Sequence, residues 1–331
     1  MSSLWTIGQL ENIVSVALER SGASADTAQS VARALVRAEI DGQSGHGLRR
    51  VESYCAQLRS GKIDGRAKPK LTVAAAASAR VNAASGFAFP ALEMAADWLV
   101  QATPLTGIAA AGVNHSHHCG VAGHWVEALA DRGLVGLMFA NTPAAIPPAG
   151  GIRPLFGTNP IAMAAPRASG PALVIDLSLS QVARGKIMAA RQKGEQIPPG
   201  WAIGPDGRDT ADPAQALAGA MLPMGGPKGA VLAMMVELLA GGLVGANRPG
   251  EASSFLDAEG PPPGTGQLLI TFSPAAFGAG NLGEWIGALE MAVTSQQGAR
   301  MPGSKRHERR VEALREGVPV DTALVQLIGK L

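Results

Sequence analysis

Hydrophobic and polar positions along the chain follow a helical spacing in some segments and a strand-like spacing in others. Two amphipathic helices are predicted first, over residues 7–21 and 25–40, and Ser24 and Asp26 lie where a helix cap is favoured. Further helices are predicted over 48–58, 89–102, 121–132, 181–193, 213–220, 229–244, 284–297 and 305–316. Short apolar runs predict strands over 71–73, 79–82, 107–113, 134–140, 161–165, 172–175 and 267–272. This alternation of helices and strands indicates an α/β chain.

Composition excludes several classes of protein. Of the 331 residues, 47 % are hydrophobic and 16 % are charged, with a net charge of +2. Disorder requires low hydrophobicity and high net charge, and nucleic-acid binding is expected to show a basic excess, so neither is indicated. Cys55 and Cys119 are too few for a disulfide framework, and the start lacks the basic and apolar regions of a signal peptide. We therefore expect a cytoplasmic, enzyme-sized protein.

The most apolar stretch covers residues 230–246 and is the one candidate for a membrane segment. Glu237 interrupts it, and Asn247 and Arg248 follow it. A membrane-spanning helix needs about 20 consecutive apolar residues. We therefore expect a buried helix here and no membrane partner.

Gly278, Gly280 and Gly283 match the dinucleotide-binding pattern G-x-G-x-x-G. In a Rossmann fold the first glycine follows a strand directly, and a second strand follows the helix. Here residues 273–277 separate the predicted strand from Gly278, and no second strand is predicted within the expected distance. Because the chain has 42 glycines, a chance match is easily made. We interpret this segment as a loop.

Four of the six histidines lie within ten positions, at the end of a buried apolar run: His115, His117, His118 and His124. Ligands in α/β folds bind at strand ends, and imidazole both gives and takes a proton near neutral pH. A proton-transfer or cofactor-contact role is the favoured interpretation. One alternative is a metal site that includes the adjacent Cys119, although neighbouring residues do not easily converge on one ion. The other is that these histidines are structural.

His46 is a second candidate for chemistry, because Gly45 and Gly47 leave space around its ring. Arg50 lies four residues later and faces the same side if the turn is helical. Arginine binds a carboxylate through a fork of two hydrogen bonds, and histidine can protonate a developing alkoxide. The pair suits a substrate with a carbonyl next to a carboxylate. A structural loop histidine is the alternative.

Four further segments can contact phosphate, ribose or amide groups: residues 157–160, 176–178, 225–229 and 305–310. The first two lie at the ends of predicted strands, and the third opens a helix whose N-terminus favours an anion. The fourth is basic and could bind a nucleotide phosphate. For that run the alternative is a solvated helix face.

Taken in order, these segments resemble the malate/L-lactate dehydrogenase type 2 family over almost the whole chain. The matching motifs are His46-Gly-Leu-x-Arg50-x-x-x-Tyr54, Ser116-His-His118-x-Gly120, Gly150-Gly151 to Gly157-Thr-Asn-Pro160, Asp176 to Ser180, Gly185-Lys186, Ile197-Pro-x-Gly-Trp201, Asp212-Pro213, Pro223-x-Gly-Gly-x-Lys-Gly229 and Pro302-Gly303. The family includes ureidoglycolate, sulfolactate and diketogulonate oxidoreductases and the Δ1-piperideine-2-carboxylate/Δ1-pyrroline-2-carboxylate reductases.

The resemblance implies a non-Rossmann, L-sulfolactate dehydrogenase-like α/β fold with a mixed sheet flanked by helices. It further implies a homodimer that uses NADPH or NADH and no metal. Residues 1–331 would form one unit, in which helical parts over about 1–70 and 300–331 surround an NAD(P)-binding region over about 71–299.

The resemblance also implies roles for single residues. His46 would be the proton donor with Ser44 as a relay candidate, and His118 would lie beside the nicotinamide and the substrate. The substrate-binding residues would be Arg50, Tyr54, Thr158, Arg184 and Gly185. The cofactor-binding residues would be His117, His118, Gly120, Thr158, Asn159, Pro160, Asp176, Leu177, Ser178, Lys186, Lys228, Gly303, Lys305, Arg306 and Arg309.

Two departures from the family pattern bear on the chemistry. Gly45 stands where the family usually has a serine directly before the catalytic histidine, and Ser44 is one step earlier. Lys186 stands where the imine-reducing branch tends to carry an acid, and a cation there disfavours a protonated imine. We therefore expect hydride transfer between nicotinamide and C2 of a small 2-oxo acid or 2-hydroxy acid. The alternatives are reduction of a cyclic ketimine carboxylate, and a nucleotide-binding member that has lost catalysis.

Overall fold

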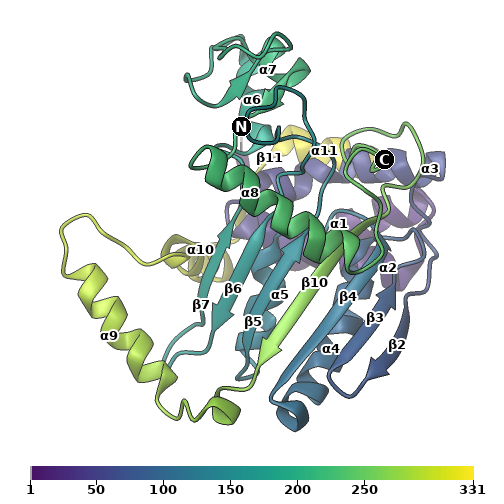
Figure 1. Cartoon of the computed structure of the whole chain (residues 1–331). Helices are drawn as coiled ribbons and strands as arrows, with labels where there is room; N and C mark the ends of the chain where they lie inside the picture. Colours follow the sequence, from purple (N-terminus) through teal and green to yellow (C-terminus); the bar gives the residue numbers. More distant parts are fainter. Residues whose placement is uncertain (1) are drawn as a thin grey trace.

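A seven-stranded mixed sheet forms the centre of the computed structural model, which describes residues 2–331 (Figure 1). Its strands, in spatial order, are β2 (Lys70–Ala75), β3 (Ser78–Asn82), β4 (Ile108–Ser116), β10 (Thr265–Phe272), β5 (Val135–Ala140), β6 (Ile161–Ala165) and β7 (Leu173–Leu177). Within residues 2–331, β3 and β4 are the one parallel pair of neighbours in this sheet. The expected α/β architecture with a mixed sheet is confirmed.

The path after β10 excludes a Rossmann unit around Gly278. β10 lies between β4 and β5 and is antiparallel to both. The chain then forms the short 3-10 helix η4 (Pro274–Phe277) and the helix α9 (Leu282–Thr294), and within the described residues no later strand joins the sheet that contains β10. Gly278 and Gly280 lie in the connection between η4 and α9, and Gly283 lies in the first turn of α9. No tight strand-to-helix turn surrounds the match, as expected.

Helices cover the two faces of the sheet unequally. α4 (Ala88–Thr106) and α5 (Ala122–Ala130) pack on one face against inward side chains such as Met138. α4 presents alanines to the strands, and such small side chains let the helix approach closely. The neighbouring residue Leu137 points to the opposite face, as the period of two requires. There the sheet is crossed by α8 (Pro227–Val236) and one turn of π-helix, η3 (Glu237–Gly242) (Figure 1).

The expectation of a buried helix over residues 230–246 is wrong. Ala233, Val236 and Ala240 pack on the sheet, but the outward face is apolar too. On that face Leu238 is 66 % exposed and Leu243 is 69 % exposed. Among the described residues no helix is long and apolar enough to cross a bilayer.

A second core joins the two ends of the chain. It contains α1 (Ile7–Arg20), α2 (Ala25–Ile40), α3 (Val51–Ser60), α10 (Ser304–Glu316) and α11 (Thr322–Lys330). The strands β1 (Ser2–Trp5) and β11 (Val318–Asp321) pair antiparallel beside them. The pattern of the sequence did not reveal β1, β11 or α11. The proposed division at about residues 70 and 300 stays a prediction.

A small lobe lies between β7 and α8. It consists of α6 (Arg184–Lys193), β8 (Ala202–Ile203), α7 (Pro213–Ala218) and β9 (Ala220–Met221). α7 begins with Pro213 after Asp212, whose side chain accepts a hydrogen bond from the Ala214 amide. Such an N-cap followed by proline explains why the helix starts there. The two short strands pair antiparallel.

Candidate active site

Three side chains from distant parts of the sequence form a chain of hydrogen bonds. Tyr54 comes from α3, His118 from the segment after β4, and His46 from the 3-10 turn η1 (Ser44–His46). Tyr54 Oη lies 2.7 Å from His118 Nδ1, and His118 Nε2 lies 3.0 Å from His46 Nδ1. The two centres that the sequence indicated separately therefore meet at one site.

Burial and one positive charge set the protonation of this chain. Burial, with a contribution from Arg50, lowers the pKa of His46 to about 4. The same two causes lower the pKa of His117 to about 3 and that of His118 well below its ordinary value. Burial raises the pKa of Tyr54, and Arg50 partly opposes this. At neutral pH the site consists of neutral imidazoles and a protonated phenol.

Arg50 ends the 3-10 turn η2 (Leu48–Arg50) and has hydrogen-bonding capacity to spare. Its Nε donates to the Gly45 carbonyl at 2.7 Å, whereas its buried Nη1 has no partner among residues 2–331. A buried N–H group without an acceptor costs free energy, which a ligand oxygen can recover. Arg50 therefore has the properties of a carboxylate receptor next to His46.

The structure does not join Ser44 to His46. Within the described chain no hydrogen bond links the two side chains, and Nδ1 of His46 is occupied by His118. Gly45, at the position of the usual serine, contributes a carbonyl to Arg50 instead. The observed polar partner of His46 is therefore a histidine.

A loop that the sequence analysis did not single out covers one side of the histidines. Phe255 is buried, and its ring centroid lies 5.0 Å from that of His117 and 5.3 Å from that of His118. Both ring nitrogens of His117 are buried and lack a partner among residues 2–331. This packing shields the inner part of the site from water.

A fully buried lysine holds this loop in place. Lys62 Nζ donates to the carbonyls of Ser254 at 2.7 Å and Glu259 at 2.6 Å. It also lies 3.1 Å from the carbonyl and 3.2 Å from the carboxylate of Asp257. Gln57 Nε2 donates to the Asp257 carbonyl at 2.8 Å. No periodic pattern marks such a residue, so Lys62 could not be recognised from its position in the sequence.

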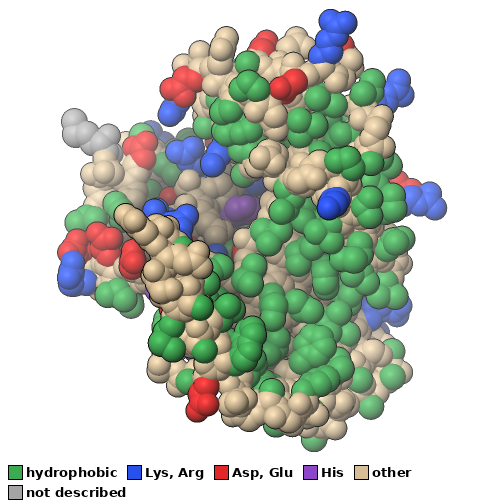
Figure 2. Space-filling model, turned by 60° about the vertical axis from the view of Figure 1, so that its left-hand side comes forward, with side chains coloured by type: hydrophobic (Ala, Val, Ile, Leu, Met, Phe, Trp, Pro, Cys, Tyr) green, Lys and Arg blue, Asp and Glu red, His purple; other side chains and the backbone are tan. Residues whose placement is uncertain are grey.

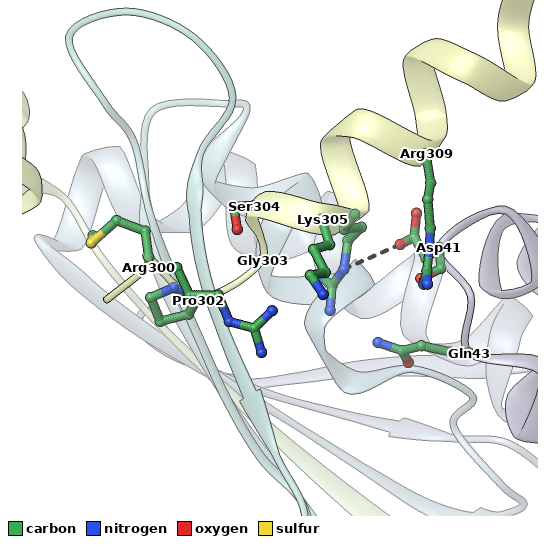
Figure 3. Close-up of a pocket in the computed structure, with 10 residues that line it drawn as sticks. Asp41, Gln43, Arg300, Pro302, Gly303, Ser304, Lys305 and Arg309 are labelled. Carbon is green, nitrogen blue, oxygen red and sulfur yellow. Dashed lines mark hydrogen bonds and ion pairs between the residues drawn. The ribbon is translucent and has the colours of Figure 1, made fainter. Parts of the chain in front are cut away.

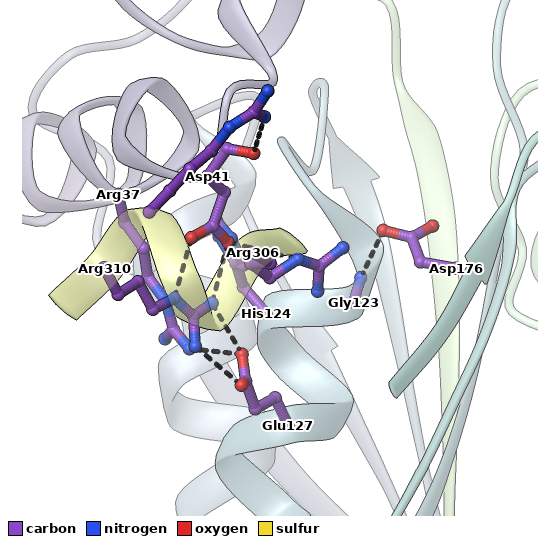
Figure 4. Close-up of polar contacts among 9 residues, drawn as sticks. Arg37, Asp41, Gly123, His124, Glu127, Asp176, Arg306 and Arg310 are labelled. Carbon is purple, nitrogen blue, oxygen red and sulfur yellow. Dashed lines mark hydrogen bonds and ion pairs between the residues drawn. The ribbon is translucent and has the colours of Figure 1, made fainter. Parts of the chain in front are cut away.

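A buried ionic cluster fixes the start of α10 against α2 and α5 (Figure 4). Asp41 accepts hydrogen bonds from His124 Nε2 at 2.8 Å and from Arg310 at 2.7 Å, and Arg306 Nε lies 3.3 Å away. Arg310 also donates to Glu127 at 2.7 and 2.9 Å. Burial alone would raise the pKa of Asp41, but the bonds from His124 and Arg310 outweigh it and lower the pKa to about 2.

Next to this cluster is a basic cavity of about 300 Å³ at the N-terminus of α10 (Figure 3). Its lining includes Arg300, Gly303, Lys305, Arg306 and Arg309. Nη1 of Arg306 is buried and has no partner in the described part of the chain. Four predicted cofactor residues thus meet in one cavity, and Arg300 is an addition that the sequence analysis missed.

Asp176 links the end of β7 to this region. Its Oδ2 accepts a hydrogen bond from the Gly123 amide at 2.9 Å (Figure 4). A Cβ atom at Gly123 would lie 2.8 Å from that oxygen and 3.1 Å from Nη1 of Arg306, so a larger residue would displace these side chains. Burial raises the pKa of Asp176.

The predicted turn over residues 157–160 is adjacent to residues 176–178. The Thr158 carbonyl accepts hydrogen bonds from the Leu179 amide at 2.8 Å and the Ser178 hydroxyl at 3.3 Å. The Asn159 side chain forms hydrogen bonds within the protein: its amide nitrogen donates to Glu237 at 2.7 Å and to the Ala233 carbonyl at 3.0 Å. Asn159 therefore has a structural bond to η3 as well as its place in the turn.

The remaining predicted site residues are more exposed or only shape the backbone. Gly120 has φ of +70°, and a Cβ there would lie 2.8 Å from Phe89. Gly185, Lys186 and Lys228 are exposed at the starts of α6 and α8, and within residues 2–331 no hydrogen bond joins them to the histidines. Arg184 lines a separate cavity of about 450 Å³, which Leu256 of the Phe255 loop also lines.

His115 is exposed, with φ of +46°, and does not join the other histidines. Among residues 2–331 no group of three His, Cys, Asp or Glu side chains is arranged to hold a metal ion.

A model of the malate/L-lactate dehydrogenase family matches residues 5–328. The chain belongs to this family. One relative, the (2R)-3-sulfolactate dehydrogenase (NADP(+)) of Chromohalobacter salexigens, is 47 % identical over 94 % of this chain and 93 % of its own.

Solved structures of related enzymes have the same fold as this chain. The Δ1-piperideine-2-carboxylate reductase of Pseudomonas syringae has a TM-score of 0.91 and 35 % identity, with 99 % of each chain covered. The sulfolactate dehydrogenase of Methanocaldococcus jannaschii has a TM-score of 0.87 and 26 % identity, covering 99 % of this chain and 97 % of its own. The expected family, the sulfolactate dehydrogenase-like fold and the enzyme class, an oxidoreductase, are confirmed.

Proposed function

We propose that this family member is an NADPH-dependent oxidoreductase that interconverts a small 2-oxo acid and the corresponding 2-hydroxy acid. The observation that carries the proposal is the position of His46 beside Arg50, whose buried Nη1 lacks a partner within residues 2–331. A proton donor next to a carboxylate receptor suits a carbonyl adjacent to a carboxylate. The 47 % identical relative is named for a substituted lactate, which has a hydroxyl group in that position.

The basic cavity supports a phosphorylated dinucleotide as the cofactor. Arg300, Lys305 and Arg309 line it, and Arg306 brings a buried, unpaired N–H group among the described residues. A helix N-terminus with several cations favours a phosphate, and the 2′-phosphate distinguishes NADPH from NADH. NADPH supplies the hydride when bound. The name of the sulfolactate dehydrogenase relative also specifies NADP(+).

Different residues of the chain then bind the substrate, donate the proton and exclude water. Arg50 binds the carboxylate in a fixed orientation, and His46 gives a proton to the oxygen on C2. Phe255 keeps water away from His118 and His117, which strengthens electrostatic interactions in the site. Lys62 holds the loop that carries Phe255.

Reduction of a cyclic ketimine carboxylate is the second candidate. It is supported by the 35 % identity, over 99 % of the chain, to a Δ1-piperideine-2-carboxylate reductase. The oxo-acid function is preferred because the cation Lys186 occupies the position where the imine-reducing branch tends to have an acid. The exposed first turn of α6 gives this lysine no acidic partner among residues 2–331 that would neutralise it.

We also infer a homodimer, with the second copy covering the outward face of α8 and η3. Figure 2 shows a broad hydrophobic surface with few charges beside the hollow in which a histidine is visible. α9 projects from the body, with Trp285 63 % exposed and Met291 68 % exposed (Figure 1). Monomeric proteins rarely expose so large an apolar area.

The experiment is a substrate panel with both cofactors, comparing 2-oxo acids with Δ1-piperideine-2-carboxylate. We expect oxidation of NADPH with an oxo acid, and a loss in kcat of about 10²–10⁴ in His46→Ala with little change in NADPH affinity. Turnover of the cyclic imine alone would favour the second candidate. Cofactor binding without turnover of any compound would indicate a member that has lost catalysis.

A further inference from the structure

The direction of the hydrogen-bond chain is set at its buried end. The Tyr54 side chain is fully buried, and its hydroxyl has one hydrogen-bond partner among residues 2–331, Nδ1 of His118. A buried phenol whose pKa is raised keeps its proton, and that proton has one acceptor within reach. Tyr54 is therefore the donor and His118 Nδ1 the acceptor.

The two imidazole tautomers follow from this direction. A neutral imidazole has one proton, so His118 carries it on Nε2 and donates it to His46 Nδ1. His46 then carries its own proton on Nε2. That nitrogen has no hydrogen-bond partner within the described residues, and the His46 side chain is partly exposed. The N–H group at the open end of the chain is thus ready to donate.

A neutral histidine alone is a poor acid, because the loss of its proton leaves an imidazolate. Protonated His46 is scarce as well, since burial and Arg50 lower its pKa to about 4. At pH 7 that pKa leaves about one molecule in a thousand in the imidazolium form. The proton that leaves His46 must therefore be replaced at Nδ1 in the same event.

We propose that Tyr54 is the source of the transferred proton, which passes through His118 and His46 to the substrate. His46 Nε2 gives its proton to the C2 oxygen, His118 Nε2 gives one to His46 Nδ1, and Tyr54 Oη gives one to His118 Nδ1. One O–H bond forms on the substrate and one breaks at Tyr54, while both imidazoles stay neutral. The electron pair enters the substrate as the hydride of the proposed function, on which this inference rests.

Recovery reverses the same path. After the product leaves, a solvent proton binds His46 Nε2, and the protons on His46 Nδ1 and His118 Nδ1 move back toward Tyr54. Burial raises the pKa of Tyr54 and so disfavours the phenolate formed in between, and the positive charge of Arg50 partly opposes this. The phenolate is therefore short-lived, and the strongly basic alkoxide that hydride transfer creates on the substrate draws the proton along the chain.

The groups around the chain are consistent with this route. Arg50 faces it from η2, His117 and Cys119 from the segment after β4, and His124 from α5. Burial raises the pKa of Cys119 to about 12, so its thiol adds no negative charge near neutral pH. Lys62 contributes a further positive charge at His117. None of these groups is a carboxylate that would hold His46 protonated.

The first test needs no turnover. Tyr54 is the only tyrosine of the chain, so the ultraviolet phenolate signal reports on it alone. We expect it to titrate well above an ordinary phenol, and ¹⁵N spectra to give the Nε2–H tautomer for His46 and His118. In Tyr54→Phe the two rings should lose this preference. Nδ1–H tautomers in the wild-type protein would overturn the proposal whatever the substrate proves to be.

The second test is kinetic. Tyr54→Phe removes only the hydroxyl, and His46 must then take its proton from solvent. We expect kcat to fall about 10²–10³-fold at pH 7 and to recover about tenfold per pH unit toward pH 5, with KM for the oxo acid nearly unchanged. Wild-type kcat should be flat over the same range.

Thr103→Val is the matched control, because it removes a buried hydroxyl away from the histidines, which donates to the Leu99 carbonyl within α4 and also contacts the Thr271 hydroxyl. It should keep the wild-type pH profile. Wild-type kcat and pH dependence in Tyr54→Phe would refute the relay while leaving the proposed reaction intact. If Tyr54→Phe does not fold, replacing the single tyrosine by fluorotyrosine tests the same point. Because fluorotyrosine is a more acidic phenol, the decline of kcat at alkaline pH should begin at a lower pH than in the wild-type protein.

Discussion

Replacing Asp41 by asparagine tests how strongly the buried ionic cluster joins α2 to α5 and α10. The substitution removes the negative charge between Arg306, Arg310 and His124 and changes little in shape. Arg310 keeps Glu127, whereas Arg306 has no other acidic partner within hydrogen-bond distance among the described residues. Removal of one partner from a buried ion pair costs about 3–5 kcal/mol.

The pKa of Asp41 gives a second magnitude for the same contact. Lowering it from 3.8 to about 2 corresponds to about 2 kcal/mol of stability at neutral pH. We therefore expect Asp41→Asn to lower the free energy of unfolding by about 2–5 kcal/mol, measured by urea denaturation at pH 7. Glu251→Gln is the control, because it breaks the Arg248–Glu251 pair, whose side chains are 87 % and 56 % exposed. Exposed pairs contribute about 0–1 kcal/mol.

The pH dependence gives a sharper criterion. A carboxylate whose pKa falls on folding stabilises the protein fully above its unfolded pKa, and the effect is lost as the pH falls through the folded pKa. The difference between wild type and Asp41→Asn should therefore be constant above about pH 5 and shrink between pH 4 and pH 2. A difference below 1 kcal/mol at pH 7, or one that does not change with pH, would refute the reasoning.

Four further outcomes are expected. Arg50→Lys should raise KM for the oxo acid at least tenfold in steady-state assays, because lysine lacks the two-pronged donor; an unchanged KM would mean that Arg50 does not bind the carboxylate. Lys62→Met should accelerate limited proteolysis within residues 248–264, since the loop carbonyls lose their donor; unchanged cleavage would contradict that role. Lys305→Ala should raise KM for NADPH about tenfold, from a charge-assisted bond of about 1.5 kcal/mol, and leave KM for NADH unchanged. Leu238→Glu should shift sedimentation toward the monomer, and an intact dimer would exclude this face as the interface.

Much of the fold could be predicted because its signals are local. The predicted strand over 161–165 coincides with β6, and the helix over 25–40 coincides with α2, which Ser24 caps. β1 and β11 could not be found, because each has four residues and its partner lies more than 300 positions away. The prediction of a buried helix over residues 230–246 was wrong for another reason. Hydrophobicity marks a surface that avoids water, and it does not tell whether the same chain covers it.

The site was predictable residue by residue but not as an arrangement. His46, Arg50 and the histidine segment were identified from residue types, spacing and family resemblance. The bond between His46 and His118 depends on how η1 and the end of β4 meet, and no local pattern contains that information. Phe255 and Lys62 were missed because a buried lysine and a loop aromatic have no periodicity to mark them.

The pairing of β1 with β11 places a condition on synthesis. Val318, Val320, Val325 and Ile328 complete the core against which α1, α2 and α3 pack. His46 and Arg50 are synthesised long before the residues that complete this core. The segment that holds the proton donor therefore cannot be fully supported until the chain has been extended through β11 and α11.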